Sequence, residues 1–142
     1  MDVSLKVASS PEEQLKAFMV RCVVFCGEQG VPYGIERDAF EDSAIHVLGE
    51  IDGEPVAAGR LRCLPDYAKL ERIAVRAPYR GRGVGAEITR FLMRLARERG
   101  YSSYRMNAQA YLEEFYGRLG FRAVGGIFLE AGIEHVTMVR ED

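Results

Sequence analysis

The sequence of 142 residues has 48% hydrophobic and 28% charged residues, which is typical of an ordinary soluble domain. A chain of this length buries roughly 70% of its unfolded surface on folding, which excludes a mini-protein that depends on disulfides. The formal net charge is −2, which excludes general attraction to nucleic acid or to an anionic membrane, so any polyanion site must be local.

No repeat, low-complexity tract or linker interrupts the sequence, and we expect one domain over residues 1–142. The N-terminus lacks the apolar core of a signal peptide, and no stretch approaches the ~18 apolar residues of a membrane span, so we expect a cytoplasmic protein. The three cysteines form no C-x-x-C pair, and we expect reduced thiols and no metal. Cys22 and Cys26 could join the two histidines around a metal, but buried thiols are commoner.

The first predicted elements are a short strand around residues 3–7 and an amphipathic helix. Ser10 and Glu13 have the spacing of a capping box, Pro11 suits the first helical position, and apolar residues then recur at helical spacing. Residues 27–42 mix glycine, proline and charges without a period. They indicate a long loop with room for one helical turn, and such loops often bind ligands.

Three strands are predicted next. Residues 44–51 and 56–64 flank the hairpin signal Asp52-Gly53, and residues 69–75 follow a second turn. Consecutive strands joined by tight turns pair with their neighbours, so we expect an antiparallel meander.

The second half of the chain is expected to alternate between helices and strands. The apolar period becomes helical over residues 83–99, and a short strand at 104–107 precedes a helix over 112–119. Residues 121–124 and 133–140 are the closing strands. The expected fold is therefore α/β (α+β), with a mixed, mostly antiparallel central sheet and helices on both faces.

The turn before the longest predicted helix is a candidate anion site. Gly81, Gly83 and Gly85 allow tight curvature and let backbone N–H groups face a ligand. The helix N-terminus adds partial positive charge, and Arg80 and Arg82 supply full charges, so a pyrophosphate would fit. Neither a dinucleotide fingerprint nor a P-loop is present. A solvated Gly-rich turn before a basic helix face is the alternative.

Two motifs carry a resemblance to a known family. Arg80-x-x-Gly83-x-Gly85 resembles the acetyl-CoA signature of the GNAT superfamily of N-acetyltransferases, and the segment from Phe115 to Phe121, with Tyr116 in it, resembles the superfamily's second landmark. The resemblance covers essentially the whole chain, and its details are similar to the ElaA-like branch. It implies a GNAT-like fold and acetyl-CoA as cofactor.

The resemblance also implies an activity. We expect an N-acetyltransferase that moves an acetyl group to a primary amine of a small molecule or protein by direct transfer in a ternary complex. Alternatives are a covalent route through Cys26 or Cys63 and a non-catalytic module that binds or senses acyl-CoA. No nucleic acid or membrane partner is expected, and a homodimer through the closing strands is left open.

Two residues are candidates for catalysis. An alkyl amine has a pKa near ~10.4, so a base helps to make it neutral, and Glu71 is the candidate, acting directly or through a water. Tyr116 matches the landmark tyrosine and is the candidate acid for the leaving thiolate, whose pKa is near ~8.5. Ordinary roles are the alternative: Glu71 could pair with Arg60, Arg62 or Arg72, and Tyr116 could simply pack in the core.

The expected cofactor contacts are Ile73, Ala74, Val75, Arg80, Gly81, Arg82, Gly83, Val84, Gly85, Asn107, Gln109 and Tyr116. A backbone N–H group within residues 73–75 would stabilise the developing oxyanion. Asn107 and Gln109 share one face of a strand, and either could meet the pantetheine arm.

The expected acceptor contacts are polar residues outside these motifs, namely Glu28, Gln29, His46, Arg60, Arg62 and His135. The two histidines lie in apolar strands and could equally be satisfied core residues. The acidic segment 36–42 could attract a cationic amine, or it could be a solvated charge run.

Overall fold

The computed structural model describes residues 2–142, so Met1 of the expected domain lies outside the described residues. The helices and strands in chain order are β1 (Ser4–Val7), α1 (Pro11–Arg21), α2 (Tyr33–Glu36), β2 (Ile45–Ile51), β3 (Glu54–Cys63), β4 (Ala68–Val75), α3 (Val84–Glu98), β5 (Ser103–Gln109), α4 (Glu113–Gly117), β6 (Arg122–Glu130) and β7 (Ile133–Glu141). None of the helices within these residues is long and apolar enough to cross a membrane.

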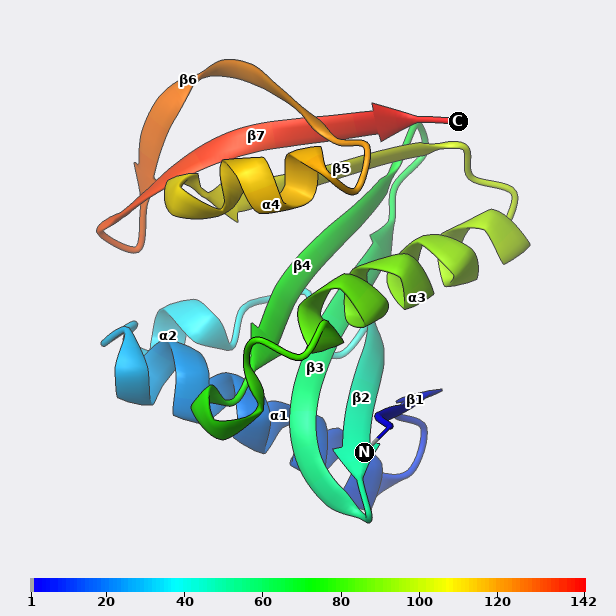
Figure 1. Ribbon diagram of the computed structural model, residues 1–142, viewed down its shortest axis with the longest axis vertical. Coiled ribbons are helices and arrows are strands. Elements are labelled where there is room, and N and C mark those ends of the chain that lie inside the picture. Colours follow the sequence, from blue (N-terminus) through cyan, green and yellow to red (C-terminus); the bar gives the residue numbers. More distant parts are fainter. Residues whose placement is uncertain (1) are drawn as a thin grey trace.

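The strands form one sheet in the order β1-β2-β3-β4-β5-β7-β6. Neighbouring strands are antiparallel except for β4 and β5, which run parallel. The meander predicted for the first half is confirmed as β2, β3 and β4. The mixed, mostly antiparallel sheet predicted from the sequence is therefore the observed architecture (Figure 1).

The start of α1 follows the predicted capping box. Ser10 Oγ accepts from the Glu13 N–H at 3.1 Å, and Glu13 Oε1 accepts from the Ser10 N–H at 3.0 Å. At its other end α1 continues into a π-helical segment, Cys22–Glu28. Such wide turns are often found at functional sites, and this one leads into the predicted long loop, whose single helical turn is α2.

Alternation along β3 places α1 and α3 on opposite faces of the sheet. Ala58 is buried in a cluster with Ala17 and Val20 of α1. Gly59, the next residue, faces α3, where an added Cβ would lie 2.9 Å from Leu92 Cδ1. Glycine at this position therefore lets α3 approach the sheet closely, and the sheet has a helix packed on each face as predicted (Figure 1).

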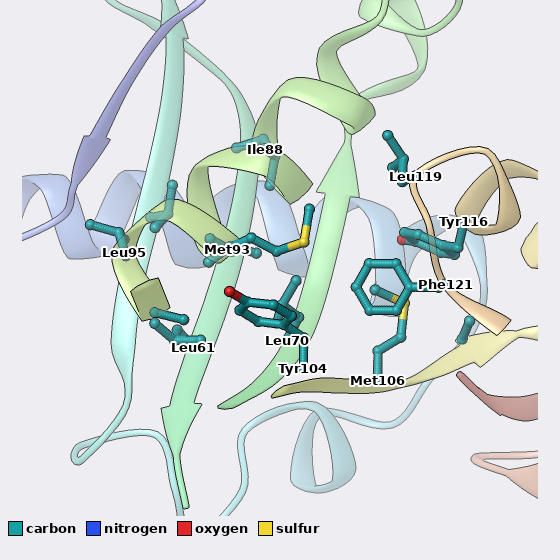
Figure 2. Close-up of a cluster of buried hydrophobic side chains, with 14 of the residues drawn as sticks. Leu61, Leu70, Ile88, Met93, Leu95, Tyr104, Met106, Tyr116, Leu119 and Phe121 are labelled. Carbon is teal, nitrogen blue, oxygen red and sulfur yellow. The ribbon is translucent and has the colours of Figure 1, made fainter. Parts of the chain in front are cut away.

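The larger core lies between α3 and the sheet. Figure 2 shows Leu61 of β3 and Leu70 of β4 near Ile88 and Met93 of α3, with Tyr104 of β5 among them. Burial of each large apolar side chain contributes about 1.5–3 kcal/mol, and these contributions hold α3 on this face. The helix therefore presents its N-terminus at a fixed position beside the end of β4.

The penultimate strand is longer than the sequence suggests. We predicted a strand over residues 121–124, but β6 runs from Arg122 to Glu130. The pairing of β6 with β7 is irregular between Val124 and Phe128, where Gly125 has φ +76°. Gly125 and Gly126, which in the sequence indicated the end of a strand, therefore lie in a bulge, and the strand continues beyond them.

The sheet opens between β4 and β5. These strands pair only at Ala68–Tyr104 and Lys69–Arg105, and Figure 1 shows them diverging beyond that point. A bulge in β4 accompanies the split, because Arg72 and Ile73 together oppose the single residue Gly59 of β3. Arg72 adopts φ +55°, which is unusual for a residue with a side chain. The opening exposes one edge of β4 to a cleft.

Candidate active site

A cleft of about 870 Å³ lies where β4 and β5 diverge. The π-helical segment and α2 form one side, and β5, α4 and the turn between β6 and β7 form the other. The edge of β4 and the N-terminus of α3 lie between them. Elements that are far apart in the sequence therefore contribute to one cavity.

The predicted cofactor contacts gather around this cleft. Its lining includes Ile73, Ala74, Val75, Arg80, Gly81, Gly83, Val84, Gly85, Asn107, Gln109 and Tyr116. Arg82 does not line the cleft, because its guanidinium lies over the ring of Tyr79, 5.8 Å from the ring centroid. The exposed guanidinium of Arg82 is thus beside the turn rather than inside the cavity.

The turn before α3 forms an anion cradle. Gly81 and Gly83 adopt φ +79° and +80°, and an added Cβ at either would meet no atom within 4 Å. Gly83 is the N-cap of α3, and no side chain caps the first N–H groups of the helix. Arg80 lies beside them, with its Nε donating to Val75 O at 2.8 Å. The cradle has the space, donors and charge for a pyrophosphate group.

Two glutamines form a bridge between the two sides of the cleft. Gln109 Nε2 donates to Gln29 Oε1 at 2.7 Å, and Gln29 Nε2 lies 3.3 Å from Gln109 Oε1. Asn107, on the same strand, accepts at Oδ1 from Thr137 Oγ1 at 3.0 Å. Both amides that we considered for a pantetheine arm therefore line the cleft, each with a protein partner.

Tyr116 packs in the core and also borders the cleft. Its ring contacts Phe115 and Phe121 edge to face, with centroid separations of 4.9 and 6.3 Å. Figure 2 shows the ring beside Phe121 and Met106. Only 5% of Tyr116 is exposed, and this burial raises the pKa of the phenol. The hydroxyl therefore stays protonated at neutral pH.

Glu71 is held by three cations. Its Oε1 accepts from Arg60 Nε at 3.0 Å and from Arg60 Nη2 at 2.8 Å, while its Oε2 lies 3.3 Å from Arg62 Nη1 and 3.2 Å from Lys69 Nζ. Burial raises the pKa of Glu71, but Arg60 and Lys69 outweigh it and the net pKa is lowered. Pairing with Arg60 or Arg62, which the sequence left as the alternative to a catalytic role, is thus observed. Arg72 instead pairs with Glu36 and Asp38.

The acidic segment 36–42 points largely inward. Glu36 and Glu41 pair with Arg21, while both oxygens of Asp38 accept from Arg60 at 2.9 and 2.8 Å. Burial alone raises the pKa of Asp38, but the hydrogen bonds and charge of Arg60 outweigh it and lower the pKa to about 2. Three of the four carboxylates in the segment are thus bound by buried arginines, and only Asp42 is left exposed.

The predicted acceptor contacts divide into two groups. Gln29, Arg62 and His135 line the cleft, whereas Glu28, His46 and Arg60 do not. Glu28 lies on the cradle side, where its Oε1 is 2.6 Å from Arg80 Nη2. Arg60 is fully buried, and His46 Nε2 lies 2.7 Å from Glu41 O, as expected of a satisfied core histidine. His135 Nδ1 likewise lies 2.7 Å from Ile133 O.

Lys69 and Phe40 line the cleft but were not singled out from the sequence, and Arg72 was considered only as a partner of Glu71. Lys69 lies two residues from Glu71 on β4 and opposite Arg62 on β3, so strand alternation could have placed it at the site. Phe40 lies under the guanidinium of Arg62, 3.5 Å from ring centroid to Cζ. Arg72 also lines the cleft. Its positive φ could not be predicted from the sequence, because the left-handed conformation is typical of glycine and, less often, of asparagine or aspartate.

The two cysteines considered for a covalent route lie outside the cleft. Neither Cys26 nor Cys63 is among the cleft residues. Within residues 2–142, no three His, Cys, Asp or Glu side chains gather as a metal site. The cleft therefore offers backbone donors, carboxylates, cations and a phenol.

Comparison with known proteins gives a consistent assignment. Residues 12–141 match the family described as Acetyltransferase (GNAT) domain. YjcF of Bacillus subtilis, called an uncharacterized N-acetyltransferase, is 43% identical over 138 residues, which cover 95% of this chain and 98% of that protein. ElaA of Escherichia coli is 33% identical over 134 residues, which cover 90% of this chain and 88% of that protein.

Solved structures agree with the sequence matches. The crystal structure of Escherichia coli ElaA has a TM-score of 0.82 and 26% identity, covering 99% of this chain and 100% of that one. An acyl-CoA N-acyltransferase from Pseudomonas aeruginosa has a TM-score of 0.84 and 29% identity, covering 98% of each chain. A GNAT family acetyltransferase from Elizabethkingia anophelis with acetyl-CoA bound has a TM-score of 0.72 over 98% of this chain and 97% of that one, and at 14% identity it shares the fold.

Proposed function

This chain belongs to the GNAT family of acetyltransferases and to its ElaA-like branch, and we propose that it transfers an acetyl group from acetyl-CoA to a primary amine by direct transfer in a ternary complex. One observation carries the proposal: the cleft between β4 and β5 is lined by the anion cradle, Tyr116 and Glu71 together. A donor held by the cradle and an amine held near Glu71 would meet there. No cleft cysteine is present among the described residues to accept the acetyl group first.

The cleft residues suit acetyl-CoA. Acetyl-CoA supplies a thioester whose carbonyl carbon can be attacked by an amine. Gly81, Gly83 and the first N–H groups of α3 would hold its pyrophosphate, with Arg80 adding a full charge. Asn107 and Gln109 would bind the pantetheine arm through their side-chain amides.

The amine must lose a proton before it attacks. Glu71 would accept this proton directly or through a water. The cations around Glu71 lower its pKa and so weaken it as a base. Burial of the amine in the cleft disfavours its ammonium form, and this effect offsets the weaker base.

Charge develops on the thioester oxygen and then on the sulfur. Backbone N–H groups of residues 73–75 on the unpaired edge of β4 would stabilise the oxygen, because fixed donors need no reorganisation. Tyr116 would donate its proton to the departing sulfur. The raised pKa of its phenol keeps that proton available at neutral pH.

The test begins with calorimetric titration of acetyl-CoA into the native chain and Gly83→Glu. Gly100→Glu is the matched control, because Gly100 has φ +89°, an added Cβ there also meets no atom within 4 Å, and it follows the opposite end of α3. We expect saturable binding to the native chain and the control and none to Gly83→Glu. Absence of binding to a well-folded native chain would overturn the proposal.

A second measurement separates an enzyme from a non-catalytic acyl-CoA module. Release of free CoA thiol is followed with a panel of primary amines, for the native chain and Glu71→Gln. An enzyme shows amine-dependent release that falls in the variant while acetyl-CoA affinity is retained. A binding module shows the same affinity in both proteins and no amine-dependent release in either.

A further inference from the structure

Arg62 and Lys69 are like charges that face each other inside the cleft. They are direct partners in the register of β3 and β4, and both line the cavity. Their side chains are only 18% and 22% exposed. Like charges directly opposite in an antiparallel pair destabilise a sheet, and partial burial strengthens their repulsion. An anion between them is therefore required.

One carboxylate oxygen serves both cations. Glu71 Oε2 lies 3.3 Å from Arg62 Nη1 and 3.2 Å from Lys69 Nζ. The other oxygen of Glu71 is occupied by Arg60, which pairs in addition with Asp38 and Glu41. Within residues 2–142, Arg62 and Lys69 form no ion pair beyond Glu71. Two full positive charges thus share one oxygen of one carboxylate.

The other acids of the cleft do not supply the missing charge. Glu36 and Asp38 are both held by Arg72, and each has a buried arginine as a further partner. Glu130 is directed to His135, with 3.8 Å between Glu130 Oε2 and His135 Nε2. Arg62 and Lys69 together therefore carry one more positive charge than the single carboxylate that they share.

The stacking of Arg62 leaves its donors available. Its guanidinium lies over Phe40, with Cζ 3.5 Å from the ring centroid. This contact uses the face of the guanidinium, whereas carboxylates bind along its edge. Phe40, which contacts Arg62, and Ile35 also give the cleft apolar surface. An anion with a short hydrocarbon chain matches both features.

We infer that the amine acceptor also carries a carboxylate, and that Arg62 and Lys69 bind this carboxylate. The inference rests on the proposed function. A carboxylate is preferred to a phosphate dianion because it supplies the one negative charge that the pair lacks. Ile73 lies four positions after Lys69 on β4, a span of about 13 Å, so several carbon atoms separate the carboxylate of the acceptor from its amine.

The kinetic test compares acceptors that differ only in charge. ε-Aminocaproate and γ-aminobutyrate are each compared with their carboxamides, as kcat/KM at saturating acetyl-CoA. For the better acid we expect a preference of about tenfold or more over its amide, the size typical of a hydrogen bond to a charged group. Arg62→Met and Lys69→Met are expected to remove the preference, and Lys69→Arg to retain it.

The control variant is Arg94→Met. It removes one positive charge from the exposed surface of α3, where Arg94 has a 3.9 Å contact with Glu98 and lies over the ring of Phe91. We expect it to keep the preference for the acid, so a change seen only in the cleft variants is local. Thermal melting of each variant verifies that it is folded.

A binding measurement makes the result independent of turnover. N-acetyl-ε-aminocaproate and its carboxamide are titrated by calorimetry into the chain with CoA present. We expect the acid to bind about tenfold more tightly, and Lys69→Met to abolish the difference. Equal transfer to acid and amide would overturn the inference and leave the proposed function intact. A binding preference that depends on Lys69, without transfer to any amine, would support the carboxylate site and overturn the proposed function.

Discussion

Arg60 and Glu71 face each other across β3 and β4, and the Nε and Nη2 groups of Arg60 donate to the same oxygen of Glu71 at 3.0 and 2.8 Å. Arg60 is fully buried, and its Nη groups also bind Asp38 and Glu41. A buried guanidinium loses its hydration, which only its partner carboxylates replace. The fold therefore depends on the completeness of this cluster.

Replacement of Arg60 by methionine is expected to destabilise the chain by about 3–5 kcal/mol, because three buried or half-buried carboxylates would lose the cation that they share. The free energy of unfolding is measured by urea denaturation. Arg94→Met on the exposed surface of α3 is the control and is expected to change the stability by less than about 0.5 kcal/mol. A loss below about 1 kcal/mol in Arg60→Met would contradict the dependence on this cluster.

Asp38 is expected to make the free energy of unfolding depend on pH. Its pKa is about 2 in the folded chain and ~3.9 when unfolded, so its contribution is present above about pH 4 and is lost as the pH falls from 4 towards 2. The difference between these two pKa values corresponds to roughly 2 kcal/mol of folding stability. The stability gap between the native chain and Asp38→Asn is expected to be widest near pH 6 and to shrink below pH 4.

Urea midpoints at several pH values measure the gap for Asp38→Asn. Asp42→Asn is the control, because the Asp42 side chain is 92% exposed. A gap for Asp38→Asn that stays constant from pH 6 to pH 3 would show that the Asp38 carboxylate is not held by Arg60 in solution.

Loss of the Tyr116 hydroxyl is expected to impair acetyl transfer without loosening the core. Tyr116→Phe keeps the ring contacts with Phe115 and Phe121 but removes the proton donor. We expect kcat to fall by about 10²–10⁴-fold, with the acetyl-CoA affinity unchanged. Tyr67→Phe, outside the cleft, is the control. Unchanged kcat in Tyr116→Phe would remove Tyr116 from the proposed mechanism.

Glu28 is expected to compete with the cofactor for Arg80. Glu28 Oε1 lies 2.6 Å from Arg80 Nη2, so a pyrophosphate that uses Arg80 must share or displace this contact. Glu28→Gln is expected to tighten acetyl-CoA binding by up to about fivefold, as suits a partly exposed ion pair. Calorimetry measures the change, and Glu114→Gln, on the exposed surface of α4, provides the reference. Weaker binding by Glu28→Gln would mean that Glu28 orients Arg80 instead.

The parts of the molecule that sequence predicted well depend on local patterns. The capping box of Ser10 and Glu13 and the glycines before α3 specify their own backbone conformations, whatever the rest of the chain does. The inward direction of Asp38 could not be predicted in this way, because its partner Arg60 comes from a strand 22 residues away. Such pairings depend on how the segment after α2 lies against β3.

The conformation of Arg72 shows a second limit. An arginine gives no sign in the sequence that its φ will be positive. The bulge at Arg72 forms where β3 and β4 pair on both sides of it. Lys69 is different, since alternation along β4 already places it beside Glu71. Attention to cross-strand neighbours, rather than to motifs alone, would have identified Lys69 as a cleft residue.

The short contact between β4 and β5 has a consequence for the lifetime of the protein. Ala68–Tyr104 and Lys69–Arg105 are the only registered pairs that join these strands, so the strand edges beyond them lack the hydrogen bonds that protect a sheet from local opening. A ligand that binds both edges stabilises the folded state, by about 2.7 kcal/mol at a concentration one hundred times its Kd. Resistance to proteolysis would then rise with the supply of acyl-CoA, so the abundance of the enzyme would follow that of the metabolite it consumes.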